Sequence, residues 1–299
     1  MSTPLVSAIV LNWNGREDLI ECLESLKEVN YPNLEIIVVD NASTDDSVDA
    51  VRSKFEVTIV ENEQNLGFGG GCNSGLAVAS GEYLLFMNND VTVDDEFLTE
   101  LIKVAETDPS VGIAGPKVYN YYKKHELCSA GGKIDLARGI MREFGVFEED
   151  SGQYDRTRNV DFVTGCVMLV RKSLIDIIGV FDQQYFIYLD DVDFCIRASK
   201  AGFVTAYVPS SKIWHKVSAT FGYVSPLSFY YSLRNRIIFE KKYASDVQKF
   251  TFVVYFMYES ALFFGYCVLR KRQELIRPFF SGLSWHLTGK NKRRVLPHN

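Results

Sequence analysis

The sequence lacks the features that would mark a nucleic-acid-binding or a disulfide-stabilised protein. Its 299 residues carry a formal net charge of −6, so there is no broad basic field to attract a nucleic acid, although residues 290–294 are locally basic. The six cysteines form no C-x-x-C pair. That spacing argues against a zinc site or a disulfide frame and predicts small, reduced core residues. We expect no nucleic-acid partner.

The glycine patterns of dinucleotide-dependent oxidoreductases and of P-loop enzymes are also missing. The segment NLGFGGGCN runs from Asn65 to Asn73, but Cys72 stands where the third glycine of G-x-G-x-x-G belongs. No Gly-Lys-Ser/Thr follows it either. A nicotinamide-dependent enzyme is therefore disfavoured, and we interpret glycines such as Gly67 as letting backbone approach a nucleotide sugar, ahead of a helix N-terminus.

The chain has no internal repeat and no low-complexity segment, and we expect no secretory leader. The apolar run 6–11 is too short for a signal-peptide core and lacks a basic flank, so we expect the body of the protein in the cytoplasm. A hydrophobic content of 47% is enough for the core of one large or two modest domains.

Short apolar runs and helical patterns alternate over the first ninety residues. The runs are 6–11, 35–40, 57–61 and 83–88, and the helical patterns are 19–26, 47–55 and 73–79. This progression predicts an α/β fold with a mostly parallel central sheet flanked by helices. Ligands of such sheets bind at the carboxyl ends of the strands, where Asn12, Asp40, Asn62 and 88–90 would gather.

The middle of the chain is expected to be less regular. Periodicity weakens over 116–161, which we interpret as a loop-rich region that shapes an acceptor cleft. A buried strand at 163–170 and a helix at 173–178 follow, and a second helix is expected over 191–200.

Two clusters of polar residues can hold a cation. Asn88, Asn89 and Asp90 follow a buried strand, where Mg²⁺ or Mn²⁺ could bridge the oxygens of a diphosphate, although such a triplet also opens ordinary turns. His215, beside Trp214, can complete a metal shell or can be a core or surface histidine.

Three acids, Asp190, Asp191 and Asp193, stand at the start of the expected helix. The helix dipole favours acids there, but three within four residues repel one another unless a cation or a protonated member relieves them. Together the clusters predict a metal-dependent transfer site in which one acid acts as a general base.

The C-terminal region changes in composition after about residue 225. Residues 250–269 are almost uninterruptedly apolar, and Lys249 and 270–272 provide basic flanks. Glu259 at the centre would cost ~3 kcal/mol in a membrane span. We favour a helix in the membrane interface, and a helix buried against the domain or a partner chain and a true span remain as alternatives.

The chain resembles the family-two, GT-A-fold glycosyltransferases, and among them the rhamnosyltransferase-like members. The matching stretches cover roughly residues 5–240 and read VSAIVLNWNGREDLIECLESL, EIIVVDNASTDDS, NLGFGGGCNSGL, YLLFMNNDV, DFVTGCVMLVRKS, VFDQQYFIYLDDVDFCIRASKAGF, VPSSKIWHKVSAT and YYSLRNRI. The resemblance implies a catalytic domain over 1–225, with a nucleotide-sugar half (1–115) and an acceptor half (116–225), followed by a helical segment over 226–299.

The resemblance also implies a role for each matching residue. Asp90 is the metal ligand of the family's Asp-x-Asp position, where Asn88 replaces the first acid, and His215 closes the metal shell. Asp191 matches the catalytic base, and Asp190 stands where the family usually has Glu. The resemblance places the donor nucleotide near Asn12, Asp40 (which holds the pyrimidine base), Asn41, Asn65, Gly67, Asn73, Asn88, Asn89 and, at the diphosphate, Arg234.

The expected reaction is an inverting sugar transfer that uses Mg²⁺ or Mn²⁺. By resemblance alone, deoxythymidine-diphosphate rhamnose is the first choice of donor, and the acceptor is a saccharide or a lipid-linked saccharide. Peripheral contact with the inner face of the cell membrane fits the apolar C-terminal segment. The rival is a non-catalytic nucleotide- or sugar-binding module of the same fold.

Overall fold

The computed structural model describes residues 3–216 and 225–288, and the basic stretch at 290–294 lies outside them. The described residues form two compact units. The first contains 3–133, 143–186 and 190–216, and the second contains 134–142, 187–189 and 225–288. The second unit therefore takes two short segments from within the range predicted as the catalytic domain.

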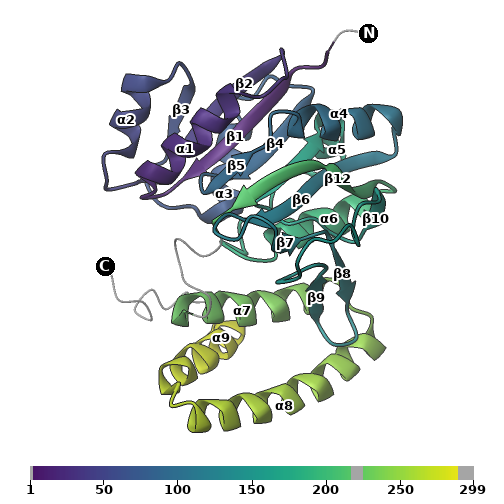
Figure 1. Ribbon diagram of the computed structural model, residues 1–299. Coiled ribbons are helices and arrows are strands. Elements are labelled where there is room, and N and C mark those ends of the chain that lie inside the picture. The colour runs from purple at the N-terminus through teal and green to yellow at the C-terminus, as the bar shows by residue number, and fades with distance from the viewer. Residues whose placement is uncertain (1–2, 217–224, 289–299) are drawn as a thin grey trace. The chain divides into compact units, whose positions relative to one another are not determined.

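The first unit is built on one mixed sheet (Figure 1). Its strands are β1 (Val6–Asn12), β2 (Leu34–Asp40), β3 (Thr58–Glu61), β4 (Tyr83–Asn88), β5 (Val91–Val93), β6 (Val111–Asn120), β7 (Leu127–Ser129), β10 (Arg158–Val160), β11 (Val167–Arg171) and β12 (Val204–His215). The main order is β10-β12-β6-β11-β4-β1-β2-β3, in which β4, β1, β2 and β3 run parallel and β11 is antiparallel to both of its neighbours.

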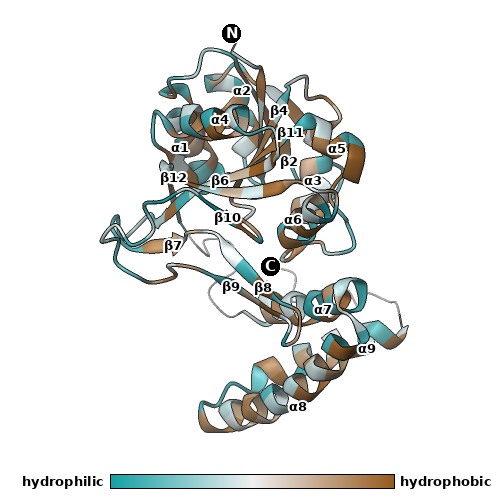
Figure 2. Ribbon diagram, turned by 90° about the vertical axis from the view of Figure 1, so that its right-hand side faces the viewer, coloured by the Kyte–Doolittle hydropathy of each residue, from teal (hydrophilic) through white to brown (hydrophobic). Residues whose placement is uncertain are grey.

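Helices cover both faces of this sheet (Figures 1 and 2). One face carries α1 (Arg16–Lys27), α2 (Ser47–Lys54) and α4 (Phe97–Thr107), and the other carries α3 (Gly67–Leu76), α5 (Lys172–Ile178) and α6 (Asp190–Lys200). The alternation of β1 explains this arrangement, because Val6, Ala8 and Val10 enter the core on the side of α1 while Ile9 faces α3.

Two expectations about the chain need correction. The region 116–161 is mostly turns and loops, as expected, but it also holds strands that the sequence did not predict: the end of β6, then β7, β8 (Gly132–Asp135), β9 (Ile140–Glu143) and β10. The helix expected at 73 begins at Gly67, so the glycine run forms its first two turns.

The glycines of α3 are needed for close packing. A Cβ at Gly71 would lie 2.2 Å from Leu11 Cδ1, and one at Gly67 would lie 1.9 Å from the carbonyl oxygen of Phe186. Gly67 also has φ +76°, which bulky residues rarely adopt. Packing within the protein therefore already requires glycine at these positions, and their predicted approach to a nucleotide sugar stays a prediction.

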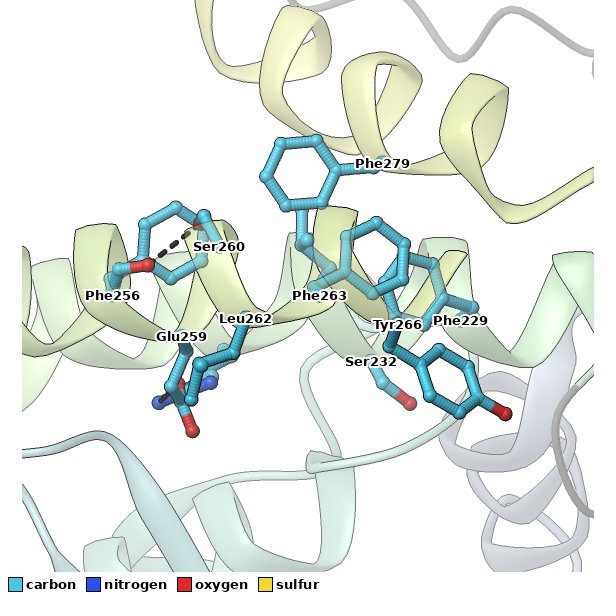
Figure 3. A pocket seen from close by; sticks show the side chains of 11 residues that line it. Phe229, Ser232, Phe256, Glu259, Ser260, Leu262, Phe263, Tyr266 and Phe279 are labelled. Atoms are coloured by element: carbon cyan, nitrogen blue, oxygen red, sulfur yellow. Dashed lines mark hydrogen bonds and ion pairs between the residues drawn. The ribbon is translucent and has the colours of Figure 1, made fainter. Parts of the chain in front are cut away.

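The second unit is mainly helical. Its helices are α7 (Pro226–Tyr243), α8 (Asp246–Leu269) and α9 (Ile276–Thr288), with a short 3₁₀ helix at Gln273–Leu275. Stacked rings join them, since Phe263 lies 4.8 Å from Phe229 and 5.3 Å from Phe279 between ring centroids. These rings line a cavity of about 480 Å³ (Figure 3).

Helix α8 leaves most of its apolar surface uncovered in the part of the chain that the structure describes. It is long and apolar enough to cross a membrane by length and composition, and only 11% of its most apolar stretch is buried. Phe250 is 71% exposed and Leu269 is 83% exposed. Glu259 points toward α7, where its Oε2 lies 2.7 Å from the guanidinium of Arg236, so the central charge of α8 is paired within the unit.

Candidate active site

Polar side chains gather at the carboxyl ends of β1, β2 and β4, as the sequence predicts. Asn12 and Asp40 are register partners in neighbouring parallel strands. The Nδ2 of Asn12 donates to Asp40 Oδ1 at 2.9 Å and to Ser47 Oγ at 2.9 Å, and Asn89 Nδ2 donates to Asn12 Oδ1 at 2.7 Å. The carboxamide of Asn12 is fully buried and links the strand ends.

Most of the hydrogen-bonding capacity of the Asp40 carboxylate is used within the protein. Besides Asn12, it accepts hydrogen bonds from the backbone N–H of Ser43 at 2.9 Å and from Ser43 Oγ at 2.6 Å. An ionised carboxylate offers about four acceptor positions. About one is left for the ring N–H of a bound base, and this role of Asp40 stays a prediction.

Three other residues of the predicted nucleotide site form hydrogen bonds to backbone groups of the protein. Asn41 Nδ2 donates to the Gly67 carbonyl at 3.0 Å, and Asn65 Oδ1 accepts the Gly67 N–H at 2.8 Å. Asn73 binds both backbone groups of Phe181, donating to its carbonyl at 2.9 Å and accepting its N–H at 3.0 Å. These contacts hold the start of α3 and the segment that leads to the acids, and nucleotide binding by the three residues stays a prediction.

The structure brings Asp90 and His215 together across 125 residues of sequence. His215 Nε2 lies 3.2 Å from Asp90 Oδ1, because β12 pairs with β5 and sets His215 opposite Val91. Burial works against ionisation of Asp90, but the charge and hydrogen bond of His215, with a further contribution from Lys216, hold the pKa of this carboxyl below its usual range. The pair is thus an anionic oxygen beside an imidazole nitrogen.

Among the described residues, no group of three or more histidine, cysteine or acidic side chains is placed to hold a metal. A two-residue site still fits Mg²⁺ or Mn²⁺, because such ions often take one or two protein ligands and complete their shell with water and phosphate oxygens. Within 3–216 and 225–288, the half-buried side chain of Asn88 makes no hydrogen bond, so its amide is available to a ligand.

Asp190 and Asp191 open α6 but differ in exposure. Asp190 is 3% exposed and its Oδ2 accepts the Gly69 N–H at 2.9 Å. Asp191 is half-buried, and its two oxygens accept the N–H groups of Gly165 and Val192, both at 2.8 Å. Burial raises the pKa of both carboxyls, and the neighbouring charge of Asp191 adds to the rise at Asp190, whose pKa is about 7. Asp191 is the more exposed of the two acids, and its role as the base stays a prediction.

Asp193 serves the fold. It is fully buried, and its Oδ2 lies 2.8 Å from Arg197 Nε one turn along α6. Its other oxygen accepts a hydrogen bond from the hydroxyl of Tyr185 at 3.1 Å. The remaining guanidinium nitrogens of Arg197 donate to the carbonyls of Ile178 and Val180, so this ion pair ties α6 to the segment after α5.

Arg234 lies in α7, in the second unit, and is 1% exposed. Its guanidinium sits over the rings of Tyr231 and Trp285, 4.7 Å and 5.0 Å from their centroids. Its Nε donates to Asn235 Oδ1 at 2.9 Å. The predicted contact with a donor diphosphate gains no support from these surroundings and stays a prediction.

Sequence reasoning missed Glu143, at the end of β9. Burial raises the pKa of Glu143 to about 7, and the charge of Asp191 raises it further while Ser129 and His215 act in the opposite direction. Glu143 thus shares the electrostatic environment of both predicted catalytic clusters. Nothing in its neighbours MREFG marks it, because only the return of the β8–β9 hairpin brings it near α6.

Comparison with known proteins identifies the family. Residues 7–178 match glycosyl transferase family 2. The chain belongs to this family. It is similar to the N-acetylglucosaminyl-diphospho-decaprenol L-rhamnosyltransferase of Mycobacterium tuberculosis, with 25% identity over 71% of this chain and 76% of that protein. It is 27% identical to the uncharacterised protein y4gI of Sinorhizobium fredii over 74% of this chain, but the match spans only 25% of that protein.

Among solved structures, the chain resembles the mannosyltransferase PcManGT of Pyrobaculum calidifontis, which was determined with GDP-Man and Mn²⁺. The TM-score is 0.63 with 16% identity, and the match covers 97% of this chain and 89% of that one. These findings confirm the predicted family, the rhamnosyltransferase-like resemblance and the GT-A fold of this family 2 glycosyltransferase.

Proposed function

We propose that this protein transfers a sugar from a nucleotide-diphosphate donor to an acceptor hydroxyl with inversion, and that Asp191 is the general base. The observation that carries the proposal is the contrast between two acids. The pKa of Asp90 is held below its usual range beside His215, whereas burial raises the pKa of Asp191 above its usual range, which strengthens it as a base. Such divergent pairs assign one carboxylate to charge stabilisation and the other to proton transfer.

In this mechanism Asp191 accepts the proton of the acceptor hydroxyl as the oxygen attacks the anomeric carbon from the face opposite the diphosphate. The N–H groups of Gly165 and Val192 orient the carboxylate. Asp90 and His215 would hold a divalent ion, which supplies positive charge to the departing diphosphate. The Mn²⁺ in the PcManGT complex supports the choice of Mg²⁺ or Mn²⁺.

Deoxythymidine-diphosphate rhamnose is the first donor to test. The similarity to the mycobacterial rhamnosyltransferase supports it, as does the acceptor position left on Asp40, which suits the ring N–H of a pyrimidine. The printed name of the same relative supports a lipid-linked saccharide as the acceptor.

A donor panel tests the proposal. Nucleotide release is measured with deoxythymidine-diphosphate rhamnose, UDP-N-acetylglucosamine and GDP-mannose, with and without saccharide acceptors, for the wild-type protein and for Asp191→Asn. We expect release with at least one donor and its loss in the variant. Binding of nucleotide without turnover by any donor–acceptor pair would instead favour the non-catalytic module.

We also propose that α8 lies in the interface of a membrane, at its inner face. Its exposed apolar side chains, among them Phe250, Val254 and Met257, recur at helical spacing along one helix that is about 36 Å long. The basic residues Lys249 and 270–272 suit anionic head groups. Since the Glu259–Arg236 ion pair faces α7, the charge does not interrupt the exposed apolar side.

A further inference from the structure

The segment that precedes the acids of α6 has an unusual backbone. Phe186, Tyr188 and Leu189 all have φ near +65°, in the left-handed region that bulky residues rarely adopt. Leu189 is joined directly to Asp190. Backbone of this kind persists only where surrounding groups fix it, and it is concentrated at functional sites. The direction in which Asp190 and Asp191 leave the turn therefore depends on what holds residues 186–189.

Two carbonyls of this turn are held by one side chain. The Nδ2 of Asn235, in α7, donates to the carbonyl of Ile187 at 2.6 Å and to that of Tyr188 at 2.8 Å. Asn235 is fully buried. A single nitrogen with two N–H groups satisfies both carbonyls, which an alanine or serine at this position could not do.

The orientation of the Asn235 amide is fixed by its neighbour. Arg234 Nε, which can only donate, lies 2.9 Å from Asn235 Oδ1, so the amide nitrogen must face the two carbonyls. The guanidinium of Arg234 in turn lies over the rings of Tyr231 and Trp285. This gives the Arg-Asn pair of the sequence SLRNRI a role that its resemblance to a diphosphate-binding element does not supply.

The turn is fixed at its other side within the first unit. The Phe186 carbonyl accepts the Phe68 N–H at 2.7 Å, and Asp190 Oδ2 accepts the Gly69 N–H at 2.9 Å. Each carbonyl from 186 to 188 thus has a donor outside the turn, and Asn235 supplies two of the three.

We propose that Asn235 is a positioning residue for the sugar-transfer reaction: it fixes the left-handed turn 186–189 and thereby sets the direction of the Asp191 carboxylate. This proposal rests on the proposed role of Asp191 as base. It places no part of Asn235 on a substrate.

The test uses the full-length chain and the variant Asn235→Asp. The substitution keeps the size of the side chain and its acceptor toward Arg234, but it places a carboxylate oxygen against the two carbonyls. We expect kcat to fall about 10²-fold, as for a displaced catalytic group, while the donor KM changes less than about 3-fold. We also expect the acid limb of the pH profile to move, because the surroundings of Asp191 change.

The matched control is Ile238→Ala. Ile238 is 7% exposed on the same helix, and the structure gives it no hydrogen bond to 186–189. If Asn235 acts only through helix stability, the two variants should lose activity in parallel with their melting temperatures. That result would overturn the proposal, as would an unchanged kcat in Asn235→Asp.

Backbone hydrogen exchange gives a readout that does not need activity. In Asn235→Asp, amides of 186–192 should exchange at least about 10-fold faster than in the wild type, and in Ile238→Ala they should not. Unchanged exchange there would refute the turn-fixing role. If the wild-type protein transfers no sugar from any donor, the proposed function fails, and the exchange result alone then decides whether Asn235 holds the turn.

Discussion

Replacing Asp191 by asparagine separates its chemical role from its structural one. The amide has one acceptor oxygen, so it can keep the hydrogen bond from Gly165 or the one from Val192, but not both. Losing one such bond costs about 1 kcal/mol of folding stability. Losing the general base should lower kcat about 10²- to 10⁴-fold, which corresponds to about 3 to 5 kcal/mol in the barrier. The activity loss should therefore far exceed any loss of folded protein.

The pH profile makes this prediction more specific. Because burial raises the pKa of Asp191 and the base must be ionised, activity of the wild type should rise with pH through a value above that of free aspartate, about 3.9. The Asp191→Asn variant should lose this limb. The assay is nucleotide release at saturating donor, with donor affinity measured separately by calorimetry and expected to change little.

Asp190→Asn is the matched control for this experiment. Asp190 is the more buried acid and its pKa is about 7, so near pH 6 the substitution replaces a mainly neutral acid by a neutral amide. We expect less than about 10-fold loss of kcat there. If Asp190→Asn abolishes turnover while Asp191→Asn does not, the base is assigned to the wrong neighbour, and if neither does, the base lies elsewhere.

Three further predictions concern the metal pair, a buried acid and the apolar helix. After chelation, Asp90→Ala and His215→Ala should each raise the Mg²⁺ or Mn²⁺ concentration for half-maximal activity at least about 10-fold, whereas full wild-type activity in excess chelator would exclude a metal role. Glu240 is 2% exposed, and within the described part of the chain neither of its carboxylate oxygens is hydrogen-bonded. Burial raises its pKa to about 7, so the folded state binds more protons than the unfolded state between about pH 4.5 and 7, and stability falls as pH rises through that window. Glu240→Gln should then be more stable than wild type by up to about 3 kcal/mol at pH 8 and by little at pH 4.5, as measured by urea unfolding, and an equal difference at both pH values would refute this assignment. Met257→Glu and Leu262→Glu, at exposed positions of α8, should weaken sedimentation with anionic vesicles, while Ile177→Glu, equally exposed on α5, should not; a wild-type protein that ignores vesicles would refute membrane contact.

The strand ends of the first unit were predictable because they depend on local pattern. Apolar runs of six or seven residues define β1, β2 and β4, and the first polar residue after each run marks the edge of the sheet. Parallel pairing then brings Asn12 and Asp40 together without further information. The same logic located Asp90, and His215 was a candidate from its residue type, but its pairing with Asp90 depends on β12 lying beside β5, which no local pattern records.

The sequence does not reveal which groups will fill the space that a glycine leaves. The run at 67–71 predicts a close approach of backbone to a nucleotide sugar, which stays a prediction, and the structure adds that Leu11 and the carbonyl of Phe186 lie where Cβ atoms of Gly71 and Gly67 would be. These partners are 60 and 119 residues away, so no local pattern records them. The strands between 116 and 161 were missed for a related reason, because most are only three or four residues long and too short for a period to show.

The three acids at the start of α6 show how tertiary structure changes the meaning of a charge cluster. The sequence predicts that either a cation or a protonated member relieves their mutual repulsion, since three carboxylates within four residues cannot all ionise freely. The protein relieves the repulsion internally, because Arg197 neutralises Asp193 and burial raises the pKa of Asp190 to about 7. Asp191 is the member of the cluster that is both partly exposed and not paired with a cation in the described residues. A divalent ion is therefore not needed at α6, and the case for one depends on Asp90 and His215 alone, which is why chelation and Asp191→Asn should affect different steps of the reaction.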